Sequence, residues 1–139
     1  MHDMRDSNLQ SWAPTLIRLI VGIVFLVHGS QKLFGFGFHG VAGFFTKAGI
    51  PLPAISAVVV TLVEFLGGAA LVLGLLTRWA AILLAIDMLG AIVFVHYKGG
   101  FFLPAGYEFA LTLLVVNLAL ALWGAGPLSV DRLLSKRRP

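Results

Sequence analysis

The sequence predicts an all-α fold, a bundle of four transmembrane helices, and three observations lead to this. Of the 139 residues, 59% are hydrophobic and only 12% are charged, whereas a soluble domain carries about 25% charged residues. The mean hydropathy is +0.97. The apolar residues form four runs close to the roughly 20 residues of one membrane crossing, without the polar outer stripe of soluble helices. The sequence therefore predicts a multi-pass membrane protein and excludes a soluble enzyme.

The four expected spans are separated by two Gly- and Pro-containing connections and one tight turn. They cover residues 15–34, 55–76, 79–95 and 109–123. We assign residues 14–124 to one transmembrane domain, residues 1–13 to a cytoplasmic N-terminal tail and residues 125–139 to a basic cytoplasmic C-terminal tail. The first span is expected to be retained and not cleaved as a signal peptide, because its start is weakly basic and no A-x-A-like site follows it.

Basic and aromatic residues predict the orientation of the bundle. With four spans, both termini share one side with the turn at Arg78. That side holds Arg5, Arg78, Arg132, Lys136, Arg137 and Arg138, and the other holds Lys32, Lys47 and Lys98. Trp12, Trp79 and Trp123 fall at span ends on the first side, and Tyr97 and Tyr107 on the second. The basic excess places both termini in the cytoplasm, and the aromatic residues are interfacial anchors.

Two further patterns each leave two interpretations open. Phenylalanines crowd the outer connections: Phe34, Phe36, Phe38, Phe44, Phe45, Phe101 and Phe102. They fit interfacial anchoring by segments that dip back into the membrane surface, or a mouth facing lipid or quinone. The residues before His28 resemble those before His96, and Glu64-Phe65 resembles Glu108-Phe109. This echo fits a 2+2 helix repeat, or chance matches in hydrophobic sequence.

Ionisable residues inside the spans are the candidates for function. An Asp, Lys or Arg at the membrane centre costs roughly 2.5–3.5 kcal/mol, so such residues usually face the bundle interior and have partners. His28 lies six residues below Phe34, at a depth of roughly 9 Å, and Glu64 lies nine residues into its span, roughly 13 Å deep. Lys32 follows His28 by one helical turn. We expect an outer cluster of these three residues, with His96 and Glu108 at its mouth.

The inner half of the bundle holds a second expected pair. Arg18 lies six residues above Trp12, and Asp87 lies nine residues above Arg78, so their heights differ by about one helical turn. We interpret Arg18 and Asp87 as a structural intramembrane pair. For the outer cluster two interpretations remain. Glu64 beside His28 is suited to proton exchange, whereas polar side chains also hold membrane helices together by hydrogen bonds.

Several kinds of chemistry find no support in the sequence. Without cysteine there is no disulfide, thiol nucleophile or Cys-held cluster. His28 and His96 lie at different depths, which disfavours bis-imidazole haem ligation, and no spacing typical of a metal site occurs. No nucleotide-binding loop or nucleic-acid module is present. Near the C-terminus, Ser129 can begin a short helix beneath a basic tail that suits anionic lipid.

Taken in order, these residues resemble the DoxX family of small membrane proteins. The resemblance runs from Arg18 to Asp131 and includes His28-Gly29-x-x-Lys32-Leu33, Glu64-x-x-Gly67-Gly68, Gly74-Leu75-x-Thr77-Arg78, Gly106-x-Glu108 and Gly124-x-Gly126-x-x-Ser129-x-Asp131. It implies a four-helix protein of the bacterial plasma (inner) membrane. Members of the family are linked to oxidoreductase assemblies, and related DoxD subunits to thiosulfate:quinone oxidoreductases, while most members have no defined activity. The resemblance therefore supports fold more than function.

The leading hypothesis is a quinone-linked redox component or accessory subunit of a membrane oxidoreductase complex. His28 and Glu64 are its candidate catalytic residues, and the candidate quinone-binding residues are Lys32, His96, Glu108, Phe34, Phe101 and Phe102. Electrons are then expected from a soluble or membrane oxidoreductase partner, because no covalent cofactor, haem or metal is expected. The alternatives are a small transporter or lipid-handling protein, and a structural subunit without chemistry. Whether the chain is an enzyme, or a homo-oligomer, stays open.

Overall fold

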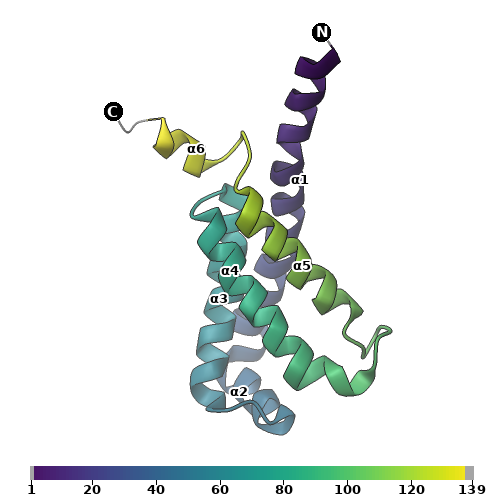
Figure 1. Cartoon of the computed structure of the whole chain (residues 1–139). Helices are drawn as coiled ribbons and strands as arrows, with labels where there is room; N and C mark the ends of the chain where they lie inside the picture. The colour runs from purple at the N-terminus through teal and green to yellow at the C-terminus, as the bar shows by residue number, and fades with distance from the viewer. Residues whose placement is uncertain (1, 137–139) are drawn as a thin grey trace.

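A computed structural model describes the backbone of residues 2–136 and the side chains of residues 9–136. The described residues form helices and no strand (Figure 1). In chain order the elements are α1 (His2–Ser30), the π-helix η1 (Gln31–Phe36), α2 (Gly37–Ala48), α3 (Pro53–Leu73), α4 (Thr77–Gly90), the π-helix η2 (Ala91–His96), the 3-10 helix η3 (Tyr97–Gly99), α5 (Glu108–Trp123) and α6 (Val130–Ser135).

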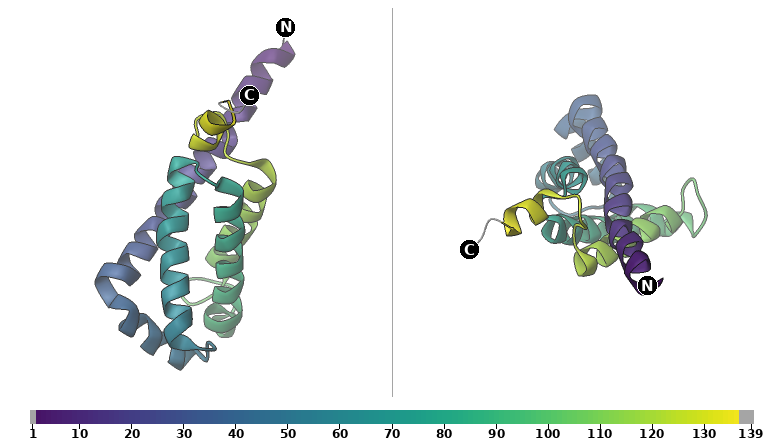
Figure 2. Two further views of the ribbon diagram at one scale, coloured as in Figure 1. Left: turned by 90° about the vertical axis from the view of Figure 1, so that its left-hand side faces the viewer. Right: turned by 90° about the horizontal axis from the view of Figure 1, so that it is seen from above.

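Four of the helices, α1, α3, α4 and α5, lie side by side and alternate in direction (Figure 2). Both termini lie at one end of this bundle, here called the termini end, and α2 lies at the opposite end, here called the α2 end. Three segments are long and apolar enough to cross a membrane, Leu9–Ala48, Pro53–Leu73 and Thr77–Gly99, and α5 is a shorter apolar helix. The predicted all-α fold is confirmed, and of the four predicted spans three to four are apolar helices that could cross a membrane.

The first of the Gly- and Pro-containing connections is largely helical, because the chain stays helical from His2 to Ala48. The turns of η1 extend α1, and α2 then turns toward α3 at the end of the bundle (Figure 2). Val41 and Phe45 of α2 are buried against Ala57 of α3, so apolar packing holds this connection in place. The helix ends at Gly49, whose left-handed conformation (φ 75°) lets its N–H bond the carbonyls of the last turn.

The backbones of α1 and α3 are in direct contact, because glycines line the interface between the two helices. A Cβ at Gly29 would lie 2.4 Å from the Phe65 nitrogen, and a Cβ at Gly68 would lie 2.4 Å from the Leu26 nitrogen. Any larger residue at either position would therefore push the helices apart, as is common where membrane helices meet through small residues. This contact fixes the position of α1 along the axis of α3. Gly29 lies one turn before Lys32 and directly beside the backbone of Glu64.

Helices α4 and α5 complete the bundle through an apolar core. Phe25 of α1, Leu71 of α3, Leu84 of α4 and Leu120 of α5 are each at most 1% exposed and belong to one cluster. All four long helices therefore contribute to one core, and their outward faces remain apolar and exposed, as a surrounding bilayer requires.

The predicted pair between Arg18 and Asp87 is wrong. Arg18 is 1% exposed, and its guanidinium donates to four backbone carbonyl oxygens. The acceptors are Leu71 (2.7 Å), Val72 (2.7 Å), Ala125 (2.8 Å) and Leu128. The carbonyls at the end of α3 have no partner within their own helix, so they suit a cation. Asp87 lies instead beside Glu64, nearer the α2 end.

The segment after α5, which we expected to be a tail, folds onto the termini end of the bundle. The Asp131 carboxylate accepts hydrogen bonds from the N–H groups of Leu76 (2.7 Å) and Thr77 (2.9 Å), and so caps the start of α4. The Asp131 N–H donates to the Gly74 carbonyl at 2.9 Å. Ser129 begins α6 by accepting from the Arg132 N–H, as its predicted capping role requires. Together with Arg18, these contacts join α1, α3, α4 and the C-terminal segment.

Candidate functional site

A largely buried ion pair links η1 and α3 in the half of the bundle nearer the α2 end. The Lys32 Nζ lies 2.6 Å from the Glu64 Oε2, and Glu64 is only 5% exposed. Lys32 follows Gly29 by one turn, so the close contact of Gly29 with Phe65 brings the lysine within reach of the carboxylate. A buried charge is tolerated where it is paired and hydrogen-bonded, and Lys32 supplies that partner.

Asp87 of α4 adds a second acid to this pair. Its carboxyl group lies close enough to the Glu64 carboxyl and to Lys32 to interact with both. Its Oδ2 is buried and has no hydrogen-bond partner among the described residues. A buried polar atom without a partner is available to a bound molecule. We call Lys32, Glu64 and Asp87 the triad.

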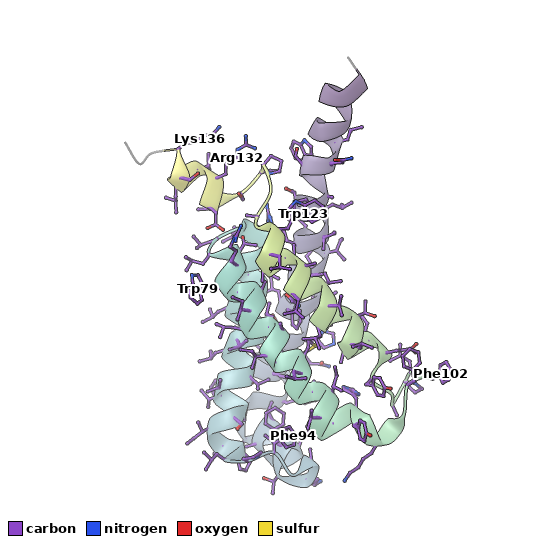
Figure 3. The ribbon with its side chains drawn as sticks, in the orientation of Figure 1. Trp79, Phe94, Phe102, Trp123, Arg132 and Lys136 are labelled. Atoms are coloured by element: carbon purple, nitrogen blue, oxygen red, sulfur yellow. The ribbon has the colours of Figure 1, made fainter. Side chains whose placement is uncertain are left out.

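The triad borders a cavity of about 610 Å³. Its walls come from α1, α3, α4 with η2, and α5, while α2 and the segment before α5 close the α2 end. The polar side chains in the lining are His28, Lys32, Ser56, Glu64, Asp87 and His96. The remaining lining is apolar and includes Phe25, Phe44, Phe45, Phe94 and Phe109; Figure 3 labels Phe94 near α2. The cavity is therefore mostly apolar, and its polar side chains come from α1, η1, α3, α4 and η2.

Several apolar side chains of the lining are also exposed. Val59 is 52% exposed, Ile86 61% and Phe94 40%, and each contributes to the cavity wall. They come from α3, α4 and η2 respectively. Part of the cavity wall is thus formed by exposed apolar side chains.

Two histidines complete the polar lining. The Nδ1 of His28 lies 2.8 Å from the Val24 carbonyl oxygen, and the Nδ1 of His96 lies 3.2 Å from the Ala105 carbonyl oxygen. A carbonyl oxygen can only accept, so Nδ1–H donates in each ring. In the neutral ring, Nε2 is then the acceptor and can take a proton or a hydrogen bond from a bound molecule.

The structure brings together four of the predicted site residues and leaves four elsewhere. His28, Lys32, Glu64 and His96 all line the cavity. Glu108 does not, because its carboxylate accepts from the Leu103 N–H at 2.7 Å and holds the connection before α5. Phe34 packs edge-on against Phe65, and Phe101 against Phe102 and Tyr107. Glu108, Phe34, Phe101 and Phe102 are thus not among the residues that line the cavity.

Sequence reasoning missed Asp87 as a member of this site. Measured from the start of its span, near Arg78, Asp87 falls in the inner half of the bundle. Counted back from His96, Asp87 lies nine residues deep (96 − 87), which equals the depth of Glu64 counted from Ile55 (64 − 55). Counting from the outer end of each span would have placed both acids at one level. No set of three His, Cys, Asp or Glu side chains in the described part is arranged to hold a metal ion.

Comparisons with known proteins agree on the family. The DoxX family matches residues 13–97. A Bacillus subtilis protein named "Putative oxidoreductase CatD" is 39% identical over 116 residues, which are 84% of this chain and 82% of that protein. An uncharacterised membrane protein of Mycobacterium tuberculosis is 42% identical, over 87% of this chain and 80% of its own length. The Escherichia coli inner membrane protein YphA is 28% identical over 95% of this chain and 99% of its length. No solved structure matches the chain.

Proposed function

The chain belongs to the DoxX family of membrane proteins, and on that premise we propose that it is a quinone-linked component of a bacterial membrane oxidoreductase system. Quinone binds in the cavity beside the triad, and the triad holds the proton that a quinone oxygen takes up on reduction. The name of the Bacillus subtilis relative supports an oxidoreductase setting, and the name of the Escherichia coli relative supports the inner membrane.

The observation that carries this proposal is the triad in the wall of a mostly apolar cavity. A quinone has an apolar tail and a headgroup with two carbonyl oxygens, which accept hydrogen bonds. The ammonium of Lys32 is a donor for one of those oxygens, and a proton held by Glu64 or Asp87 serves the other. The volume of about 610 Å³ lies within the roughly 300–1,000 Å³ of ligand pockets. The tail enters from the bilayer beside the exposed side chains of Val59 and Ile86.

The electrons come from a partner in this proposal. Reduction of a quinone to a quinol takes two electrons and two protons, and both quinone oxygens become hydroxyl groups. The chain contains no cysteine, and no group of three His, Cys, Asp or Glu side chains among the described residues is placed to hold a metal ion. Its own side chains orient the headgroup, exclude water from it and supply protons. The electron donor is an oxidoreductase subunit that docks with this chain.

Substituting Glu64 by glutamine is expected to weaken quinone binding about tenfold, which is the loss expected for one hydrogen bond involving a charged group. The measurement is a titration of the full-length protein, purified free of quinone, with a short-tailed ubiquinone or menaquinone analogue. Asp87 remains as a counter-ion for Lys32 in this variant, so the fold is expected to persist.

Glu108→Gln is the matched control, because Glu108 lies outside the cavity lining and glutamine can still accept the hydrogen bond from Leu103. Its quinone affinity is expected to stay within about twofold of the native value, a change well below one hydrogen bond. Equal affinities of the Glu64→Gln and Glu108→Gln variants, or an absence of saturable binding by the native protein, would reject the proposal.

A further inference from the structure

A second hollow lies at the termini end of the bundle, away from the triad. It has a volume of about 510 Å³ and lies between the start of α4, the end of α5 and the C-terminal segment. Its lining includes Arg78, Trp79, Trp123, Asp131 and Arg132. Figure 3 labels Trp79, Trp123 and Arg132 at this end. We call it the inner groove, and nothing in the proposed quinone chemistry uses it.

The inner groove has an unbalanced positive charge. Arg78 and Arg132 are both exposed, and neither guanidinium has a hydrogen bond or ion pair within the described residues. The acid in the groove, Asp131, already uses one oxygen for the Leu76 N–H and the other for the Thr77 N–H. The two arginines are thus available to an external anion, and a guanidinium fits two oxygens of a phosphate group.

The apolar surroundings place the inner groove at the depth of lipid headgroups. Trp79 is 69% exposed and Trp123 53%, and tryptophan concentrates at the boundary between hydrocarbon and water. Leu76 and Leu128 are 61% and 62% exposed at the same end. The apolar spans α4 and α5 begin and end there, so an anion in the groove has hydrocarbon beside it. A soluble anion would leave the exposed tryptophans and leucines without a partner, whereas a lipid covers them with its acyl chains.

We propose that the inner groove is a binding site for an anionic phospholipid, whose phosphate lies between Arg78 and Arg132 and whose upper acyl chains contact Trp79 and Trp123. The lipid joins the start of α4, the end of α5 and α6 at the surface, and this site is independent of the quinone cavity. Basic side chains near a membrane attract anionic lipids, and the pairing of two free guanidiniums with two tryptophans restricts that attraction to one place.

Quenching of tryptophan fluorescence by brominated lipids tests this site directly. The full-length protein carrying Trp12→Phe, in which the remaining tryptophans are Trp79 and Trp123, is reconstituted in mixtures of brominated phosphatidylglycerol or brominated phosphatidylcholine. Phosphatidylglycerol is expected to quench more strongly at equal mole fraction. Its relative binding constant is expected to fall about fivefold for each arginine removed in Arg78→Gln, Arg132→Gln and the double variant. If the double variant does not fold, each single variant is compared with its parent.

Lys47→Gln/Lys98→Gln is the matched control, because it removes the same charge from exposed lysines near the α2 end. It is expected to keep the full preference for phosphatidylglycerol. Three results would overturn the proposal: equal quenching by both lipids, an undiminished preference in the arginine variants, or an equal fall in the lysine control. Loss of the preference in millimolar inorganic phosphate would also overturn it, because the groove would then be a site for soluble anions.

Discussion

Replacing Arg18 by methionine is expected to lower the free energy of unfolding of the detergent-solubilised protein by about 3 kcal/mol or more. The substitution keeps an unbranched apolar stem, but it leaves the carbonyl oxygens of Val72, Ala125 and Leu128 without a donor, whereas the Leu71 oxygen keeps the Gly74 N–H at 3.2 Å. Each orphaned carbonyl costs about 1 kcal/mol or more. The change in stability is measured by unfolding in sodium dodecyl sulfate, followed by far-ultraviolet circular dichroism.

The same variant is expected to loosen the C-terminal segment first, because Arg18 is the side chain that ties Ala125 and Leu128 to α1. Faster amide hydrogen exchange over residues 125–135 reports this local opening. Arg132→Met is the control, since Arg132 is exposed at the same end and its loss is expected to cost less than about 0.5 kcal/mol. An Arg18→Met protein as stable as the Arg132→Met protein would contradict the assigned role of Arg18.

Substituting Lys32 by methionine is expected to lower the free energy of unfolding by about 3 kcal/mol, because it leaves the buried Glu64 carboxylate without its cation. The double variant Lys32→Met/Glu64→Gln is expected to recover part of that loss, since Asp87 is then the one acid of the triad left without a cation instead of two. Unfolding of the single and double variants measures the coupling between the two residues.

Lys98→Met is the control for this cycle, because Lys98 is exposed in η3 and has no ion-pair partner among the described side chains. It is expected to change stability by less than about 0.5 kcal/mol. If Lys32→Met is no less stable than Lys98→Met, or if Glu64→Gln adds a further loss instead of recovery, then Lys32 does not neutralise a buried carboxylate.

The parts of the fold that depend on composition and spacing could be predicted from the sequence. Four apolar runs give the four long helices, since the bilayer sets the length of each run. Gly29 and Gly68 could be expected at a helix contact, because small residues allow membrane helices to approach. The helical course of the first connection could not be predicted. Its glycines are typical of a loop, and the helix depends on the packing of Val41 and Phe45 against Ala57.

The site was harder to predict, because its members depend on which faces of α1 and α4 point into the bundle. His28, Lys32 and Glu64 share one level, which counting along the chain can show. Whether Asp87 turns toward Glu64 or toward Arg18 depends on the rotation of α4, and the sequence leaves that rotation undetermined. Arg18 finds backbone carbonyl oxygens instead of an acid, and such acceptors cannot be recognised from side-chain types.

Photolabelling is the most direct test that α1, α3 and α4 join their ionisable side chains around one ligand cavity. A quinone with a photoreactive headgroup is irradiated with the full-length protein in lipid, and the labelled peptides are identified by mass spectrometry. We predict adducts within Val59–Glu64 of α3 and Asp87–Val95 of α4 and η2, which line the cavity. Excess unlabelled quinone and the Glu64→Gln substitution are expected to suppress them. Labelling confined to residues 97–102 or to the termini end, or labelling indifferent to both treatments, would contradict a quinone site at the triad.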